Sequence, residues 1–256
     1  MILINKKIYI FAENCNVLKL IMKKYGSFIA GICLMLLSAV TARAQYSMGT
    51  AGMLNAPSAE MHETGTFVIG GNFLPKSINP FKFNTGNYFV GITLFDFMEL
   101  TYRETLLKTT YMTEKPKFNQ QDRSMSIRIR PLKEGKYHPA IVIGAHDPFN
   151  DLGENYYQAV FGAATKHLDW GGHELGLTVG YMGCTGNRNR LNNGVFGGVT
   201  YRPAFCKEAT LTVEYDTHRV NVGVAARLWR HVSLHAFTSG FDCISGGIRY
   251  ECVLIH

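Results

Sequence analysis

The chain has 256 residues, which is enough for one large or two small domains. It carries 26 Lys and Arg against 19 Asp and Glu, but six of these basic residues and one of the acidic residues precede Gln45. The chain from Gln45 onward therefore has 20 basic and 18 acidic residues, a net charge of +2. Nucleic-acid binding requires a marked excess of positive charge, so the composition excludes nucleic acid as a partner.

The first 44 residues have the features of a cleaved export signal. A basic pair at Lys23 and Lys24 is followed by an apolar run over residues 28–40, and small residues stand just before Gln45. A signal peptidase recognises this order of features. The apolar run is shorter than the roughly 20 residues that a transmembrane helix needs. We predict cleavage between Ala44 and Gln45.

The sequence after the predicted cleavage site is dominated by alternation. In residues 209–216, apolar side chains alternate with Thr, Glu and Asp, and residues 219–228 and 124–130 show the same period of two. This period is typical of strands with one apolar and one polar face. Most of the alternating segments approach the nine to eleven residues of a tilted membrane strand. We expect about twelve strands, near residues 66–73, 87–95, 98–106, 122–130, 140–146, 157–167, 174–182, 194–201, 208–216, 219–228, 231–239 and 245–252.

The connections between these segments favour an up-and-down barrel. Long and short connections alternate through most of the chain, as in transmembrane barrels with short periplasmic turns and longer outer loops. The prediction is an all-β, antiparallel, up-and-down transmembrane β-barrel of about 12 strands. Residues 1–44 form the N-terminal extension and signal peptide, residues 45–63 a periplasmic or lumenal segment, and residues 64–256 the barrel. Met22 is an alternative start that would leave residues 1–21 untranslated.

The segment after the leader resembles the opening of a known family. It reads GTAGMLNAPSAEM over residues 49–61, followed by Gly65 and Thr66. Further matches follow in order and with matching spacing, at residues 126–132, 137–147, 153–156 and 214–216. Together they cover most of residues 48–230 and resemble the YjbH family, which comprises bacterial outer-membrane β-barrel proteins associated with exopolysaccharide production.

The resemblance implies an outer-membrane location and contact with outer-membrane lipid. It also implies polysaccharide and other envelope export proteins as partners. Members of the family are considerably longer, so the resemblance implies a one-barrel version of their architecture or a truncated family member. Barrel precursors often end on an aromatic residue, and the nearest one to His256 here is Tyr250.

The strand parity assigns a set of charged side chains to the lumen. A charge on the lipid face costs about 2–4 kcal/mol near the middle of the membrane, so the apolar face of each strand must be the outer one. Two interpretations of the inward charges stay open, a neutralising network that plugs the barrel and a lining that conducts a solute or contacts a glycan. The residues predicted to face the lumen are Glu99, Arg103, Arg128, Arg130, Glu214, Asp216, Arg227 and Arg249.

No motif of a catalytic, cofactor or metal site occurs in the sequence. The Gly-x-Ser-x-Gly, His-Glu-x-x-His and phosphate-loop patterns are missing. His231 and His235 would share one face of a strand about 13 Å apart, too far for a common metal ion. Residues 147–153 carry Phe149 and Leu152 where a calcium loop needs an oxygen ligand and a glycine. We predict a protein that is not an enzyme and uses no cofactor or metal.

Four cysteines follow the leader, and they could pair in three ways in an oxidising compartment. Cys184 and Cys243 fall in loops on the same predicted outer side, whereas Cys206 falls on the opposite side. The pair to consider first for a disulfide is therefore Cys184 and Cys243, and sequence alone leaves Cys252 unassigned.

The leading hypothesis is an outer-membrane barrel that assists export or surface placement of exopolysaccharide without catalysis, a function that the resemblance implies. The first alternative is a structural or partner-binding barrel that conducts nothing. The second is a soluble secreted β-sandwich that binds glycans.

Overall fold

The computed structural model describes residues 46–79, 81–149, 156–185 and 191–254. The predicted leader and its cleavage site lie outside these residues. No helix in the described part of the chain is long and apolar enough to cross a membrane. The strands are β1 (Thr66–Leu74), β2 (Thr85–Phe95), β3 (Met98–Thr109), β4 (Lys117–Leu132), β5 (Ala140–His146), β6 (Ala159–Trp170), β7 (His173–Cys184), β8 (Gly194–Arg202), β9 (Ala209–Tyr215), β10 (Val220–Trp229), β11 (Val232–Ser239) and β12 (Cys243–Val253).

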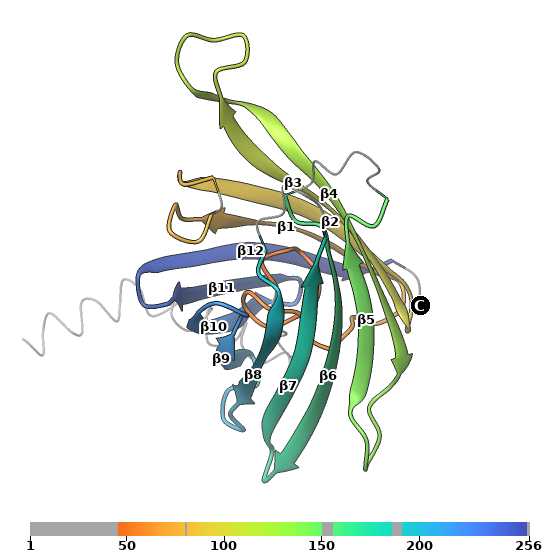
Figure 1. The fold of residues 1–256 in the computed structure, drawn as a ribbon. Helices are drawn as coiled ribbons and strands as arrows, with labels where there is room; N and C mark the ends of the chain where they lie inside the picture. The colour runs from red at the N-terminus through yellow and green to blue at the C-terminus, as the bar shows by residue number, and fades with distance from the viewer. Residues whose placement is uncertain (1–45, 80, 150–155, 186–190, 255–256) are drawn as a thin grey trace, which may run out of the picture. The chain divides into compact units, whose positions relative to one another are not determined.

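The strands form one antiparallel sheet that closes on itself (Figure 1). Each strand pairs with its neighbours in sequence, and β12 returns to β1 from the pair Thr66 and Val253 to the pair Phe73 and Gly246. The predicted all-β, antiparallel, up-and-down barrel of about 12 strands is confirmed. The β-sandwich alternative is wrong, because a sandwich consists of two sheets with open edges.

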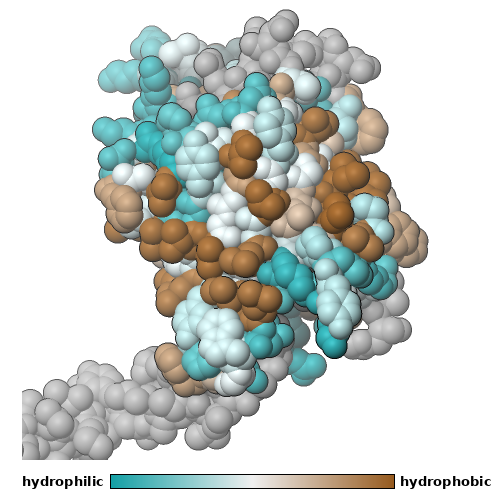
Figure 2. All heavy atoms as spheres, turned by 60° about the horizontal axis from the view of Figure 1, so that its bottom comes forward, coloured by the Kyte–Doolittle hydropathy of each residue, from teal (hydrophilic) through white to brown (hydrophobic). Residues whose placement is uncertain are grey.

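Side chains alternate between a polar lumen and an apolar outer surface. In β3, Glu99, Thr101 and Arg103 are buried, whereas Tyr102 between them is exposed. A soluble protein buries its large apolar residues, so an apolar outer surface around a polar interior is typical of a barrel that contacts lipid. Figure 2 shows apolar side chains gathered across one face of the molecule. Exposed apolar residues of the wall include Ile143, Val160, Val179, Val195, Val213 and Ile248.

The two rims of the barrel differ in their connections. We call the rim at the end of β1 the outer rim and the opposite one the inner rim. Three inner-rim turns have only two residues, at 96–97, 171–172 and 230–231. The three longest connections lie at the outer rim, at residues 75–84, 147–158 and 185–193.

The β3–β4 hairpin is longer than the sequence pattern predicts. The expected loop of residues 107–121 is largely paired, because β3 and β4 stay paired up to Thr109 and Lys117, with one register shift between Leu107 and Lys108. Figure 1 shows this hairpin extending past its neighbours at the outer rim. Apart from Phe118, residues 117–123 are polar, so the hydrophobic alternation that marks the other strands stops before the backbone pairing does.

The seam between β1 and β12 offers a test of barrel closure. Gly247 pairs with Asn72 across this seam, and a Cβ at Gly247 would overlap the carbonyl oxygen of Gly71. We expect Gly247→Ala to destabilise the folded barrel by about 1–3 kcal/mol through overpacking. A heat-modifiability gel in detergent would show the folded band lost at a lower temperature. The matched control is Gly183→Ala, where the nearest atom to the added Cβ is 3.7 Å away. Equal behaviour of the two variants would contradict this account of the seam.

Candidate functional site

Residues 46–62, which we call the plug segment, fill the lumen of the barrel. All of them are buried except Asn55 and Glu60, which are partly buried. The segment precedes β1 and contains no regular strand or helix. An irregular chain inside a barrel can be stable only if its backbone polar groups find partners there. The wall residues that supply these partners define the candidate site.

The plug segment first satisfies part of its own backbone through tight turns. The Ser47 N–H donates to the Leu54 carbonyl at 3.0 Å, and the Met53 N–H donates to the Ala56 carbonyl at 2.9 Å. Gly49 has a φ of +90°, and a Cβ there would lie 2.6 Å from the Phe89 ring. The glycine is thus required both by the backbone conformation and by the close approach of the wall.

Two buried carboxylates of the wall accept hydrogen bonds from the plug backbone. Glu99 of β3 accepts from the Ala51 N–H at 3.1 Å. Glu214 of β9 accepts from the Leu54 N–H at 2.9 Å and, through its other oxygen, from the Asn55 N–H at 2.5 Å. Glu99 lies 3.2 Å from the Arg128 guanidinium, and hydrogen bonds to an ionised group are about twice as strong as neutral ones. Glu214 binds two consecutive backbone N–H groups, so these two side chains are the main anchors of the segment.

Donors of the wall hold the carbonyl groups of the plug segment. Arg128 donates to the carbonyl oxygens of Ser58 and Glu60, the latter at 2.8 Å, and its other nitrogen lies 3.2 Å from Glu99. One arginine thus binds the plug and neutralises the carboxylate that also binds it. At the other end of the segment, the Ser47 carbonyl accepts from two side-chain amides of the wall, those of Asn72 at 3.0 Å and Asn87 at 2.9 Å.

A cluster of charged groups surrounds the end of the plug segment near the inner rim. The His62 ring lies 3.7 Å from Glu99 and 3.8 Å from Glu251. Glu251 also pairs with Arg249 at 3.3 Å and with Arg227. These residues come from three strands and the plug, so the cluster ties the segment to the wall where β1 begins.

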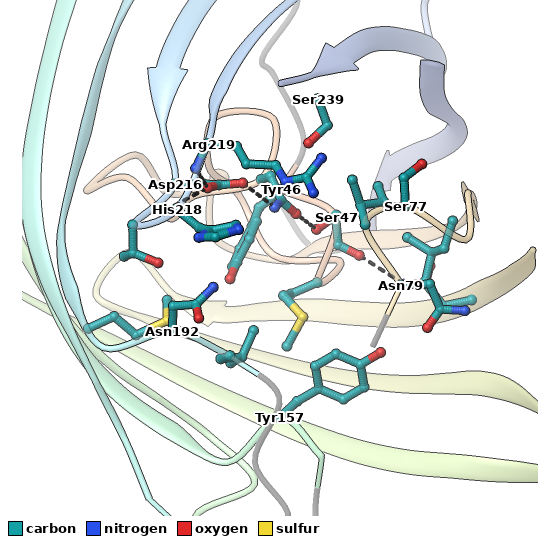
Figure 3. A pocket seen from close by; sticks show the side chains of 18 of the residues that line it. Tyr46, Ser47, Ser77, Asn79, Tyr157, Asn192, Asp216, His218, Arg219 and Ser239 are labelled. Carbon is teal, nitrogen blue, oxygen red and sulfur yellow. Dashed lines mark hydrogen bonds between the residues drawn. The ribbon is translucent and has the colours of Figure 1, made fainter. Parts of the chain in front are cut away.

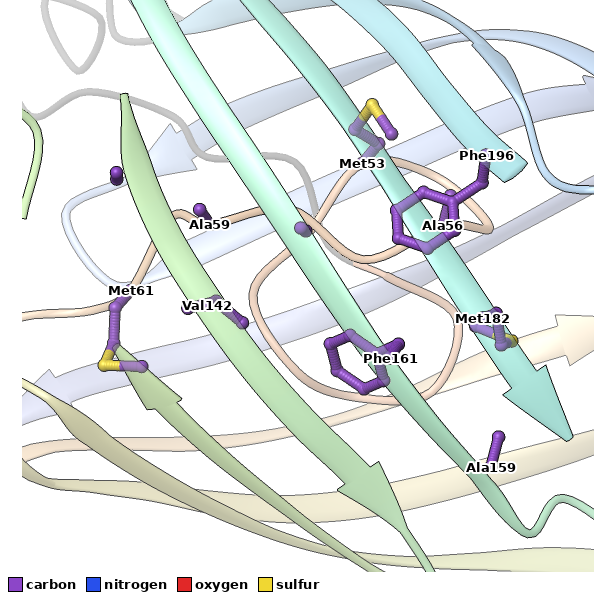
Figure 4. Close-up of a cluster of buried hydrophobic side chains, with 11 residues drawn as sticks. Met53, Ala56, Ala59, Met61, Val142, Ala159, Phe161, Met182 and Phe196 are labelled. Atoms are coloured by element: carbon purple, nitrogen blue, oxygen red, sulfur yellow. The ribbon is translucent and has the colours of Figure 1, made fainter. Parts of the chain in front are cut away.

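Apolar contacts complete the fit between plug and wall (Figure 4). Met53, Ala56, Ala59 and Met61 of the plug pack in one cluster with wall side chains that point inward. The small alanines allow the backbone of the plug to approach the wall closely. The wall side chains of this cluster are Ala140, Val142, Ala159, Phe161, Ala163, Met182 and Phe196.

Most of the charged residues predicted from strand parity lie around the plug. Asp216 lies in the turn after β9 and accepts from the Asn55 side-chain amide at 2.7 Å. Arg130 is partly buried at the inner rim and donates to the Asp96 carbonyl. The other six are buried on the inner face of the wall, namely Glu99, Arg103, Arg128, Glu214, Arg227 and Arg249.

Sequence reasoning missed the uncharged residues that hold the plug. Thr165 of β6 accepts from the Ala59 N–H at 2.9 Å, and the amides of Asn72 and Asn87 bind the plug as described. Their inward parity was available from the same alternation that assigned the charges. This parity did not single them out, because Asn and Thr are common on the inner face of any barrel with a polar lumen.

The cysteines do not form the expected bond. All four in the described residues are free thiols. Cys184 ends β7 and Cys243 begins β12, so both lie at the outer rim, but five strand steps separate them around the wall. Neighbouring strands are about 4.8 Å apart and a disulfide needs Cα atoms within about 7 Å. The disulfide predicted between Cys184 and Cys243 is therefore not formed in this structure.

A pocket of about 240 Å³ lies between the plug segment and the outer-rim connections (Figure 3). We call it the outer pocket. Burial raises the pKa of Tyr157 to about 12, although the positive charge of Arg103, 4.2 Å from the ring, lowers it. Burial likewise raises the pKa of Tyr46 well above its usual range. Both phenols are therefore neutral at physiological pH. The lining includes Tyr46, Ser77, Asn79, Tyr157, His218 and Ser239.

The carboxylate anchors can be tested by conductance. We expect the double variant Glu99→Gln and Glu214→Gln to loosen the plug, because each amide leaves buried N–H groups with a weaker or missing acceptor. A cost of about 1.5–3 kcal/mol at each site would raise the unplugged fraction by about a hundredfold or more. The readout is single-channel activity of the purified barrel in planar bilayers.

The control for this test is Glu104→Gln, which removes a carboxylate from the outer face of the same strand β3. We expect it to stay as closed as the wild type. If the double variant folds, shows a normal heat-modifiability shift and remains closed, the carboxylates do not hold the plug.

Comparisons with known proteins connect this site to one family. A family model described as exopolysaccharide biosynthesis protein YbjH, of the YjbH family, matches residues 44–238. That match includes the whole plug segment and most of the wall. No curated protein sequence matches the chain significantly.

Solved structures with a related architecture are only distantly similar. The outer membrane phospholipase dimer of Salmonella typhi with bound calcium is 10% identical, at a TM-score of 0.32, over 73% of this chain and 88% of that one. Outer membrane phospholipase A of Escherichia coli is 8% identical, at a TM-score of 0.35, over 74% of this chain and 92% of that one. Likenesses of this size transfer no activity or binding site to the present chain.

Proposed function

Because this chain belongs to the YjbH family of exopolysaccharide biosynthesis proteins, we propose that it assists the export or surface placement of an exopolysaccharide as a non-enzymatic barrel of the bacterial outer membrane. The observation that carries the proposal is the position of the opening segment, the part of the chain that resembles the start of the family, inside the barrel. Residues 49–61, the opening that resembles the family, belong to the plug segment that fills the lumen. Plugging the barrel is therefore central to what the chain does.

The surface of the wall supports an outer-membrane location. Large apolar side chains are exposed around the barrel, such as Ile143 at 60% and Ile248 at 53%. In water they would drive aggregation, whereas in a bilayer they are solvated by lipid. The export signal predicted before Gln45, cleaved after Ala44, would deliver the chain to the envelope.

The polar groups of the interior support a function without catalysis. Ser126 and His146 form the contact most similar to a hydrolytic pair, with 2.7 Å between Oγ and Nδ1. Both side chains are buried in the wall beneath Tyr46, whose ring lies 5.8 Å from that of His146. A Ser–His–acid arrangement needs the second ring nitrogen to be oriented by a carboxylate, and the described residues place none there. Substrate could not reach this pair while the plug is in place.

A barrel that binds partners and conducts nothing is the second candidate. The occupied lumen favours it, because the plug segment is buried against the inner face of the wall. In this case the outer loops would engage other envelope export proteins. Both candidates share the closed barrel and differ in whether polysaccharide handling depends on the protein.

Deletion of the gene distinguishes the two candidates. We expect a several-fold loss of cell-surface polysaccharide, restored by the full-length chain expressed from a plasmid. The amount is measured by sugar analysis of the washed cell surface. A variant with Gly49→Val should fail to restore it, because the side chain would collide with Phe89 and displace the plug. Unchanged surface polysaccharide in the deletion strain would support the partner-binding barrel instead.

A further inference from the structure

The outer pocket has the composition of a site for an uncharged, hydroxyl-rich ligand. It is bounded below by Tyr46 of the plug and at the sides by Ser77 of the β1–β2 connection and His218 of the β9–β10 turn. Figure 3 shows these side chains around one hollow, with Ser239 and Tyr157 on opposite sides of it. Its volume of about 240 Å³ is just below the roughly 300–1,000 Å³ of drug-sized ligand pockets, so a ligand of one or two rings fits.

Three charged residues line the pocket, Arg103, Asp216 and Arg219, and each has a partner within the protein. Arg103 donates to the Ser124 hydroxyl at 2.8 Å and lies 4.0 Å from Asp122. Arg219 binds Asp242 at 2.9 Å. Asp216 accepts from the side-chain amides of Asn55 at 2.7 Å and Asn221 at 2.9 Å. Because a charged ligand would have to compete with these pairs, the lining favours a neutral ligand.

Ser239 shows that the pocket offers an unused hydrogen-bonding group. Its side chain lines the pocket, is fully buried, and has no hydrogen-bond partner among the described residues. A buried hydroxyl without a partner is unfavourable, and a ligand hydroxyl group placed in the pocket would relieve this cost. The neutral phenol of Tyr157 and the amide of Asn192 add further donors and acceptors around the same space.

We propose that the outer pocket binds one or two sugar rings of a neutral polysaccharide. This inference rests on the proposed function and names its ligand class and place of contact. The chain would hold a glycan strand at the outer rim while the plug segment keeps the lumen filled. The pocket then serves as a surface docking site for the polymer.

Binding can be measured with the mature protein in detergent. The probe is a set of oligosaccharides of two to six sugars released by mild acid from the cell's own exopolysaccharide, titrated by isothermal calorimetry. We expect saturable binding by the wild type and about a tenfold loss in the double variant Ser239→Ala and Asn192→Ala, which removes two hydrogen-bonding groups. We also expect Ser77→Trp to abolish binding by filling the pocket from a loop.

The matched control is Thr238→Ala, which removes the neighbouring hydroxyl on the outer side of β11 and should bind like the wild type. Absence of binding by the folded wild type, or unchanged binding by Ser77→Trp, would overturn the proposal. Stronger binding of an anionic tetragalacturonate probe than of the neutral set would also overturn it.

The two proposals fail in different ways. Loss of surface polysaccharide in the deletion strain without oligosaccharide binding would overturn only the pocket assignment. Binding that depends on Ser239, in a strain whose surface polysaccharide does not depend on the gene, would overturn only the proposed function.

Discussion

Buried backbone N–H groups need acceptors, and the interior of this barrel is organised around that requirement. The plug segment has too few regular hydrogen bonds of its own, so the wall must supply them. Glu99 and Glu214 do so from wall strands that lie far from the plug in the sequence, since their bonds to the plug join residues separated by 48 and 160 positions. Each carboxylate is in turn stabilised by donors, including Arg128 beside Glu99 and the Asn221 amide beside Glu214. The charge of Glu99 is thus balanced by Arg128, and both side chains bind the plug.

This arrangement brings together the two interpretations that strand parity leaves open. A charge network that plugs the barrel and a lining that contacts a ligand are distinct alternatives only when side chains alone occupy the lumen. Here the network binds a segment of the same chain. Space remains at both ends of that segment, in the outer pocket and in a pocket of about 270 Å³ beside Glu60 and Arg130 near the inner rim. A barrel of twelve strands is intermediate between filled and open barrels, and this one is filled by a dedicated segment in addition to its side chains.

The wall was predictable from sequence because lipid imposes a rule on every second residue. Twelve segments and their faces could be assigned from alternation alone, as in residues 209–216. The β3–β4 hairpin beyond residue 107 could not, because no apolar outer face is required there. The sequence indicated a periplasmic or lumenal segment over residues 45–63, but the conformation of the plug was not predictable, for a different reason. Its conformation depends on partners such as Thr165 and Glu214, and contacts over 100 residues or more leave no periodic trace in the local sequence.

The position of the plug segment also has a consequence for how the barrel assembles. His62 contacts Glu251 of β12, and only three residues separate it from the first residue of β1. The Leu254 N–H, just after β12, donates to the Gly65 carbonyl at 2.9 Å. These contacts lie beside the pairing of the first strand with the last, which is the pairing with the greatest separation along the chain and the largest loop-closure entropy. The segment that fills the lumen therefore also helps to hold the wall closed, because its last residue contacts the strand that completes the sheet.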